Sequence, residues 1–274
     1  MGRAATTDDE RRPMRSPSAY RAAFGETCIE QKAYLTCYTE VQRVSTPWPE
    51  LDPHLQLKPG RVAAYATSEP AQAMGYQFVG CAAAQGLWTI CCYPMWDRRL
   101  DRPPVIALRG EPIHVTGVED LLTRLDAVGI RPGLVYFDGF SGINWWQSQR
   151  GFTPEAEAEA CIVTLKHIAM EHQLPVLIRL DYDRADEASM YDPMLGVPVV
   201  GNLGAEAIVA DYVDSLVLMQ DVYEGDTHLV APHVVKNRDG ERGGFVAFPW
   251  GRKGSLSRAE FNALGRSEGE EEAG

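Results

Sequence analysis

A chain of 274 residues, 45% of them hydrophobic, is long enough to bury one large core, and we expect one principal domain. No apolar run approaches the ~18 residues that a membrane-spanning helix requires, so the sequence predicts no membrane association. The formal net charge of −12 opposes non-specific attraction to nucleic acid, because phosphate contacts normally need a basic surface, and any DNA contact must therefore be local.

The cysteines and the first residues of the chain indicate a reducing compartment. The six cysteines form no C-x-x-C pair, and several lie inside apolar runs, as small core residues do. The first residues are polar and lack the apolar segment of a secretory signal. We therefore expect a cytoplasmic protein.

Composition divides the chain into four parts. Residues 1–17 are charged and show no apolar periodicity, which predicts a disordered tail. In residues 18–45 apolar side chains recur at three- and four-residue steps, which predicts a helical linker outside the core. Residues 46–252 carry the core elements, and residues 253–274 form an acidic tail.

Strands and helices alternate through the core. Apolar runs bounded by turn residues predict strands at 62–65, 89–93, 131–138, 175–178 and 215–219, with shorter apolar runs at 105–108 and 113–115. Apolar stripes at helical spacing predict helices at 76–84, 118–128, 154–172 and 204–211. A hairpin of 228–236 with 244–249 follows the last of these strands. This order predicts an α/β fold with a largely parallel sheet.

The strand that ends at Asp138 carries the first candidate for chemistry. Its residues Leu134 to Phe137 are all apolar or aromatic and stand between Pro-Gly and Asp-Gly, as in a strand covered on both faces. Ligands of open α/β sheets gather at such strand ends, where an acid can hold Mg²⁺ beside a nucleotide. The alternative is that Asp138 caps a helix.

Four short segments, in this order and spacing, resemble one family: Leu57-Lys58-Pro59-Gly60, residues 154–178, Pro193-Met194-Leu195, and Lys236-Asn237-Arg238-Asp239-Gly240 with residues 243–248. Over about residues 46–250 the chain resembles the RecA-like C-terminal ATPase domain of DnaB-type replicative DNA helicases. The resemblance implies a RecA-like, mainly parallel twisted sheet flanked by helices, with a C-terminal antiparallel hairpin. It also implies that Asp138 corresponds to the metal-binding acid, and that Lys236 and Arg238 correspond to basic residues that reach a neighbouring subunit's nucleotide.

The phosphate loop of that family is degenerate in this chain. The family has Gly-x-x-x-x-Gly-Lys-Ser/Thr after its first strand, because backbone N–H groups and a lysine hold the phosphates. No Lys or Arg occurs between Arg61 and Arg98. The corresponding window provides Ala66, Thr67, Ser68, Ala71, Gln72 and Ala73.

Two further catalytic parts of the family are also replaced. The catalytic glutamate falls near Pro94 or Met95, and the glutamine sensor is replaced by Asp181, next to Arg179. We therefore expect a pseudo-ATPase without nucleotide or Mg²⁺, acting as an accessory in DNA replication or recombination. An active ATP-dependent helicase or translocase with an aberrant phosphate loop, which would bind ATP and Mg²⁺, is one alternative, and a protein-interaction module without a nucleic-acid role is another.

A purely structural role is an alternative for each of the remaining candidate residues. Asp138 could bridge to Arg179, and Arg238 could hold the turn of the hairpin. The loops at 141–154 and 183–203 carry candidate DNA or partner residues, namely Trp145, Trp146, Arg150 and Arg184. The tryptophans could stack on unpaired bases, anchor a partner or pack in the core. We expect weak single-stranded DNA binding at best, with self-association or a replication-protein partner as the other use, and the scattered histidines predict no metal site.

Overall fold

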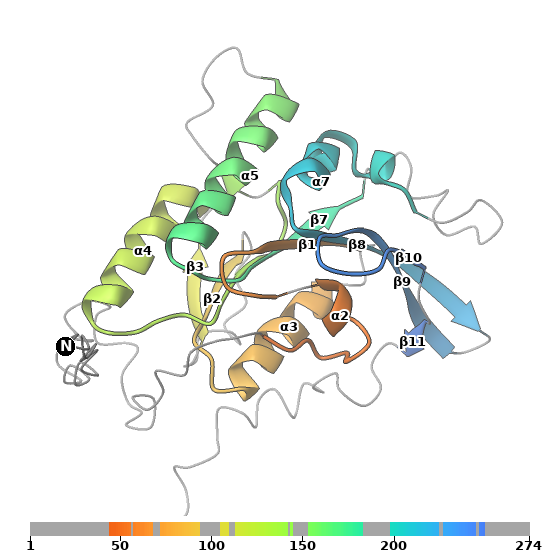
Figure 1. Cartoon of the computed structure of the whole chain (residues 1–274), viewed down its shortest axis with the longest axis horizontal. Helices are drawn as coiled ribbons and strands as arrows, with labels where there is room; N and C mark the ends of the chain where they lie inside the picture. Colours follow the sequence, from red (N-terminus) through yellow and green to blue (C-terminus); the bar gives the residue numbers. More distant parts are fainter. Residues whose placement is uncertain are drawn as a thin grey trace, which may run out of the picture.

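The computed structural model describes residues 44–55, 57–67, 72–93, 105–109, 113–141, 143–144, 153–182, 198–224, 227–244 and 247–249. The predicted tails at 1–17 and 253–274 lie outside these residues, as does all but the end of the predicted linker at 18–45. Within the described residues, nine strands form one sheet in the order β10-β9-β8-β1-β7-β5-β2-β3, and β11 also pairs with β9 (Figure 1).

The centre of the sheet is parallel. β1 (Val62–Thr67) and β5 (Leu134–Phe137) both pair in parallel with β7 (Val176–Asp181), which lies between them. Beyond β5 follow β2 (Thr89–Tyr93) and β3 (Val105–Arg109), again parallel. The prediction of an α/β fold with a largely parallel sheet is confirmed.

The other edge of the sheet is antiparallel. β8 (Ser215–Glu224) is parallel to β1 but antiparallel to β9 (Thr227–Asn237), which also pairs with β10 (Gly243–Gly244) and β11 (Phe248–Pro249). The predicted terminal hairpin is therefore present. β8 is longer than its apolar core suggested, because β9 provides hydrogen-bond partners along its whole length. A separate parallel pair joins β4 (Ile113–His114) to β6 (Ile143–Asn144).

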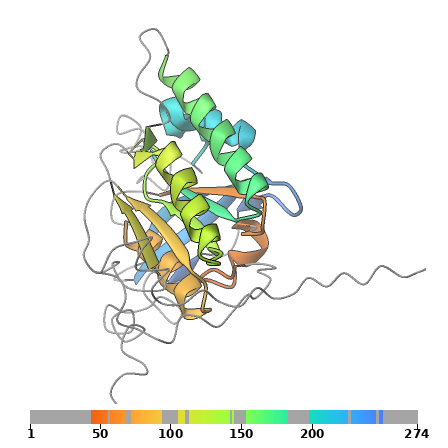
Figure 2. The same cartoon turned by 90° about the vertical axis from the view of Figure 1, so that its left-hand side faces the viewer.

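Helices cover both faces of this sheet. On one face lie α4 (Val115–Ala127) and α5 (Pro154–Glu171), together with η5 (Val200–Ile208) and α7 (Val209–Tyr212). On the opposite face lie α2 (Asp52–Leu55) and α3 (Gln72–Ala84) (Figures 1 and 2). No helix in the described part of the chain is long and apolar enough to cross a membrane.

The strand residues alternate between two buried clusters, one on each face. In β1, Val62, Ala64 and Ala66 pack toward the cluster that includes α4 and α5, whereas Ala63 and Tyr65 pack toward the cluster that includes α3. Side chains of a strand alternate between faces, so a strand whose residues are all apolar must be covered on both. The full burial of β1 therefore follows from its sequence together with helices on either side.

Two helix ends show how local chemistry sets the boundaries. Thr153 is the N-cap of α5, and its Oγ1 accepts a hydrogen bond from the Ala156 N–H at 3.3 Å, which is typical of a threonine that precedes Pro and Glu at the start of a helix. The helix predicted at 204–211 is instead the 3₁₀-helix η5 followed by α7, because Gly204 has φ 55° and ψ −128°, which interrupts helical geometry. The helix predicted at 118–128 begins earlier, since Val115, the last residue of the short apolar run before it, is the first residue of α4.

Candidate site at the carboxyl edge of the sheet

The carboxyl ends of the three central strands bring several chemically active side chains together. Thr67 at the end of β1 lies beside Asp181 at the end of β7, and Phe137 of β5 lies beside Ile178 of β7. Asp138, the residue after β5, is therefore separated from the end of β1 by β7. This is the edge at which open α/β sheets bind ligands.

Asp138 is buried and accepts hydrogen bonds from other side chains of the same chain. Its Oδ1 accepts a hydrogen bond from Arg179 Nε at 2.7 Å and another from the Tyr136 hydroxyl at 3.1 Å. Only 12% of the Asp138 side chain and 11% of the Arg179 side chain are exposed, so water screens this ion pair little. Arg179 also donates through Nη1 to Asp181 Oδ1.

The guanidinium of Arg179 is the positive centre of the site. Burial lowers its pKa, but the carboxylates of Asp138 and Asp181 outweigh that effect, and the net pKa lies above the ordinary value. Burial also raises the pKa of the two tyrosine hydroxyls, Tyr65 and Tyr136, which lie 3.0 Å apart. The site therefore contains a permanent cation, two neutral phenols and the carboxylates that neutralise the cation.

Two glycines permit the close packing of this site. A Cβ on Gly75 of α3 would lie 1.9 Å from the Tyr136 hydroxyl oxygen, so the helix that follows β1 lies directly against that tyrosine. Gly139 has φ +97°, and a Cβ there would lie 3.1 Å from Arg179 Nη2. The chain can turn after Asp138 only because a glycine tolerates this backbone conformation.

These residues do not fit a Mg²⁺ ion held by Asp138. One Asp138 oxygen already accepts two hydrogen bonds, so this carboxylate is not free to bind an ion through both oxygens, and the charge beside it is a guanidinium. A second cation beside Arg179 would be repelled. Among the residues that the structure describes, no cluster of three or more His, Cys, Asp or Glu side chains could hold a metal ion.

Glu206 joins the same edge, and the sequence contained no signal for it. Its Oε2 accepts a hydrogen bond from the Asp181 backbone N–H at 3.0 Å. Removal from water raises the pKa of Glu206 to about 7, against the opposing effect of the hydrogen bond from Asp181. Glu206 lies 25 residues beyond Asp181 and follows the long loop, so its proximity depends on the tertiary fold.

Lys236 and Arg238 lie near the opposite edge, beside the amino ends of the parallel strands. Lys236 of β9 pairs with Leu216 near the start of β8, and its Nζ donates to the carbonyl oxygens of Ala210 and Asp211 at 2.8 Å each. Arg238 Nη1 donates to Asp214 Oδ1 at 3.0 Å. The structure therefore does not bring these two residues together with Asp138 in one chain.

Asp214 is the centre of a second ionic cluster, also not anticipated from the sequence. Arg61 Nη1 lies 3.0 Å and Lys166 Nζ 3.7 Å from its Oδ1, and its Oδ2 accepts from the Val62 N–H at 3.1 Å. Burial raises the pKa of Asp214. The hydrogen bond from the Val62 N–H and the nearby cations, Arg238 among them, together lower it by more, so the net pKa lies below the ordinary value. This cluster joins the starts of β1 and β8.

The predicted phosphate loop and DNA loops are described only in part. Ala66 and Thr67 are the last residues of β1, and Gln72 and Ala73 are the first residues of α3. The other candidates lie outside the described residues: Ser68, Ala71, Trp145, Trp146, Arg150 and Arg184. The predicted positions of the catalytic glutamate, Pro94 and Met95, also lie outside them.

Comparisons with known proteins agree with this geometry at the level of the fold. No protein-family model matches the chain, and no curated protein matches it. Among solved structures, it is similar to one described as a DnaB-like replicative helicase and its interactions with primase, with a TM-score of 0.64 and 12% sequence identity. The match covers 80% of this chain and 64% of the helicase chain, so this chain spans less than two thirds of that protein. The chain therefore shares its RecA-like α/β fold with that structure.

Proposed function

We propose that this chain is a helicase-like domain that does not hydrolyse ATP and that acts as an accessory protein in DNA replication or recombination. The observation that carries the proposal is the buried ion pair between Asp138 and Arg179, at 2.7 Å. In an active enzyme of this fold the corresponding acid would help to hold Mg²⁺ on the nucleotide. Here an arginine of the same chain supplies the positive charge.

The sequence after β1 supports the same proposal. The 36 residues from Val62 to Asp97 contain no Lys or Arg that could neutralise phosphate oxygens. The packing of Gly75 against Tyr136 adds a second constraint, because α3 follows the phosphate-loop position and already lies in contact with the Asp138 network. We therefore propose that neither ATP nor Mg²⁺ is a cofactor of this protein.

ATP turnover by the purified protein is the direct test. We expect phosphate release at the background rate with and without single-stranded DNA, and no change on Asp138→Ala. Asp120→Asn, at an exposed position of α4, serves as the matched control. Robust hydrolysis that Asp138→Ala abolishes and Asp120→Asn leaves intact would overturn the proposal and establish an active motor with an aberrant phosphate loop.

A protein-interaction module without a nucleic-acid role is the second candidate, and the net charge of −12 favours it. The double variant Trp145→Ala with Trp146→Ala distinguishes the two roles. Loss of weak, salt-sensitive binding to a labelled single-stranded oligonucleotide would support the DNA role. Unchanged DNA binding with altered sedimentation would support self-association. If both measurements match the parent, these tryptophans serve neither role.

A further inference from the structure

Helix α5 is apolar on two opposite faces. One face, which includes Ile162, Leu165 and Ile168, packs into the core between the helix and the sheet. The opposite face carries Val163 and Met170, whose exposed fractions are 47% and 56%. A surface helix normally places charged and polar side chains on the face that points away from the core. The outer face of α5 departs from this rule.

Five residues along this outer face follow one another at steps of four and three positions. We call them the outer stripe of α5: Ala156, Ala160, Val163, His167 and Met170. Such steps keep side chains on one side of an α-helix and are typical of a helix that packs along a second helix. All five residues are partly or largely exposed. The outer stripe therefore has the spacing of a helix–helix contact but faces solvent.

The neighbouring helix α4 shows the usual arrangement. Its buried residues include Val118 and Leu121, and its exposed residues include Asp120, Thr123 and Arg124. Both helices cover the same face of the sheet and form part of the outside of the molecule (Figures 1 and 2). The apolar outer stripe is therefore a property of α5 and not of the whole helical layer.

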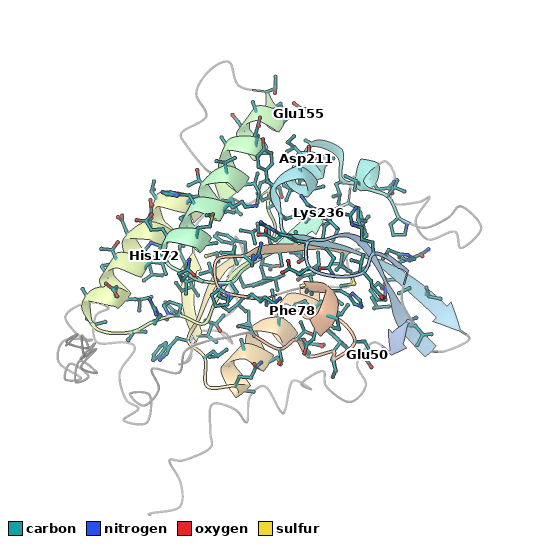
Figure 3. All side chains as sticks on the ribbon, in the orientation of Figure 1. Glu50, Phe78, Glu155, His172, Asp211 and Lys236 are labelled. Atoms are coloured by element: carbon teal, nitrogen blue, oxygen red, sulfur yellow. The ribbon has the colours of Figure 1, made fainter. Side chains whose placement is uncertain are left out.

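The charges of α5 are distributed unequally along its 18 residues. The first half, residues 154–162, contains three glutamates and no basic residue, whereas the second half contains Lys166, one histidine and one glutamate. Figure 3 shows Glu155 near the amino end of the helix and His172 at its carboxyl end. Two such helices in parallel would bring their acidic halves together, and the antiparallel orientation avoids this repulsion. The helix dipoles also favour the antiparallel orientation.

The outer stripe is complementary in size to itself in the antiparallel orientation. Ala156 and Met170 lie seven residues on either side of Val163, so a two-fold axis at Val163 places Ala156 of one copy opposite Met170 of the other. Ala160 lies three residues before Val163 and His167 four residues after it, so the same axis brings these two side chains together. A small side chain thus meets a large one on each side of the axis.

We propose that the outer stripe of α5 is a docking surface for a second copy of this chain, with the two α5 helices packed antiparallel about a two-fold axis at Val163. The contact from Ala156 to Met170 spans about 21 Å, since an α-helix rises about 1.5 Å per residue. One pair of helices of this length buries less area than a standard stable interface, so we expect a weak, concentration-dependent dimer. The inference concerns assembly and does not rest on the function proposed above.

Disulfide cross-linking of the full chain tests the surface and the orientation together. We expect Val163→Cys to give a covalent dimer on oxidation, because the two-fold axis brings the two copies of this position close together. Ala156→Cys and Met170→Cys should not cross-link alone but should cross-link when the two variants are mixed. Asp120→Cys, at an exposed position of α4, retains every native cysteine and is the control for non-specific oxidation.

Sedimentation equilibrium measures the association without an added thiol. Val163→Glu should weaken self-association by at least about tenfold, because two glutamates would meet at the axis of an apolar contact. Val163 is exposed, so this change should leave the core and the circular dichroism spectrum as in the parent. Thr123→Glu adds the same charge at an exposed position of α4 and should associate as the parent does.

The remaining outcomes would contradict the proposal. A parent that is monomeric at every concentration, with Val163→Cys no more cross-linked than Asp120→Cys, would exclude the dimer. Cross-linking of Ala156→Cys with itself and not with Met170→Cys would exclude the antiparallel arrangement. Association that persists unchanged in Val163→Glu would place the interface on another surface. A monomeric chain that Val163→Glu destabilises would show that a segment of the same chain covers the outer stripe.

Discussion

Replacement of Arg179 by methionine tests whether the ion pair with Asp138 organises the candidate site. Methionine matches the length of the aliphatic part of arginine but removes the cation. The Asp138 side chain is only 12% exposed and would lose its closest charged partner. Loss of one partner of a buried ion pair costs about 3–5 kcal/mol of unfolding free energy, because the other charge is left uncompensated. We expect a loss in that range for Arg179→Met.

A second substitution separates this electrostatic effect from a loss of packing. Asp138→Asn in the Arg179→Met background removes the uncompensated charge and keeps the shape of the side chain. Since replacement of both partners of a buried pair is often close to neutral, the double variant should be more stable than Arg179→Met by roughly 2 kcal/mol or more. Asp138→Asn alone should cost about 1–2 kcal/mol, because Arg179 keeps Asp181 as a partner.

Urea unfolding, followed by circular dichroism at pH 8, measures these differences. The control is Arg131→Met, since Arg131 is exposed. Two results would refute the reasoning: a cost below 1 kcal/mol for Arg179→Met, or a double variant whose loss equals the sum of the two single losses.

Three further predictions concern stability. Gly75→Ala places a Cβ 1.9 Å from the Tyr136 hydroxyl oxygen and should lower the free energy of urea unfolding by about 1–3 kcal/mol. Gly117→Ala is the control, since a Cβ on this glycine of α4 would meet nothing within 4 Å, and it should stabilise the protein by up to about 1 kcal/mol. Equal effects at the two glycines would contradict the close approach of α3 to Tyr136. Asp214→Asn should cost about 1–3 kcal/mol at pH 7. The folded-state pKa of Asp214 lies below the ordinary value of 3.8, so the stability that this carboxylate contributes is present above pH 3.8 and disappears in stronger acid. The difference in unfolding free energy between Asp214→Asn and the parent should therefore narrow in acid, and a constant difference from pH 7 to pH 2.5 would exclude this origin. Thr153→Ala removes the N-cap of α5 and should cost about 1 kcal/mol in thermal unfolding, with Thr153→Ser restoring most of it.

Most of the fold could be predicted because its signals are local. The strands at Val62, Thr89 and Val176 are short apolar runs between turn residues, and a run of this kind requires helices on both faces of a sheet. The N-cap at Thr153 follows from the chemistry of three adjacent residues. Where the prediction differed, at η5, the local pattern was helical but Gly204 adopts a conformation that the periodicity of its neighbours does not reveal.

The degeneracy expected at the phosphate loop comes from the sequence alone, since the lack of Lys and Arg from Val62 to Asp97 does not depend on any structure. The partners of the remaining charges depend on the tertiary fold. Arg179 meets Asp138 because β7 lies beside β5, although 41 residues separate them in the chain. Glu206 reaches the same edge only through the packing of η5 on the sheet. A sequence determines which charges are available, but strand order and helix packing decide which of them lie within 3 Å of one another, and in a buried site that distance sets both the protonation state and the chemistry.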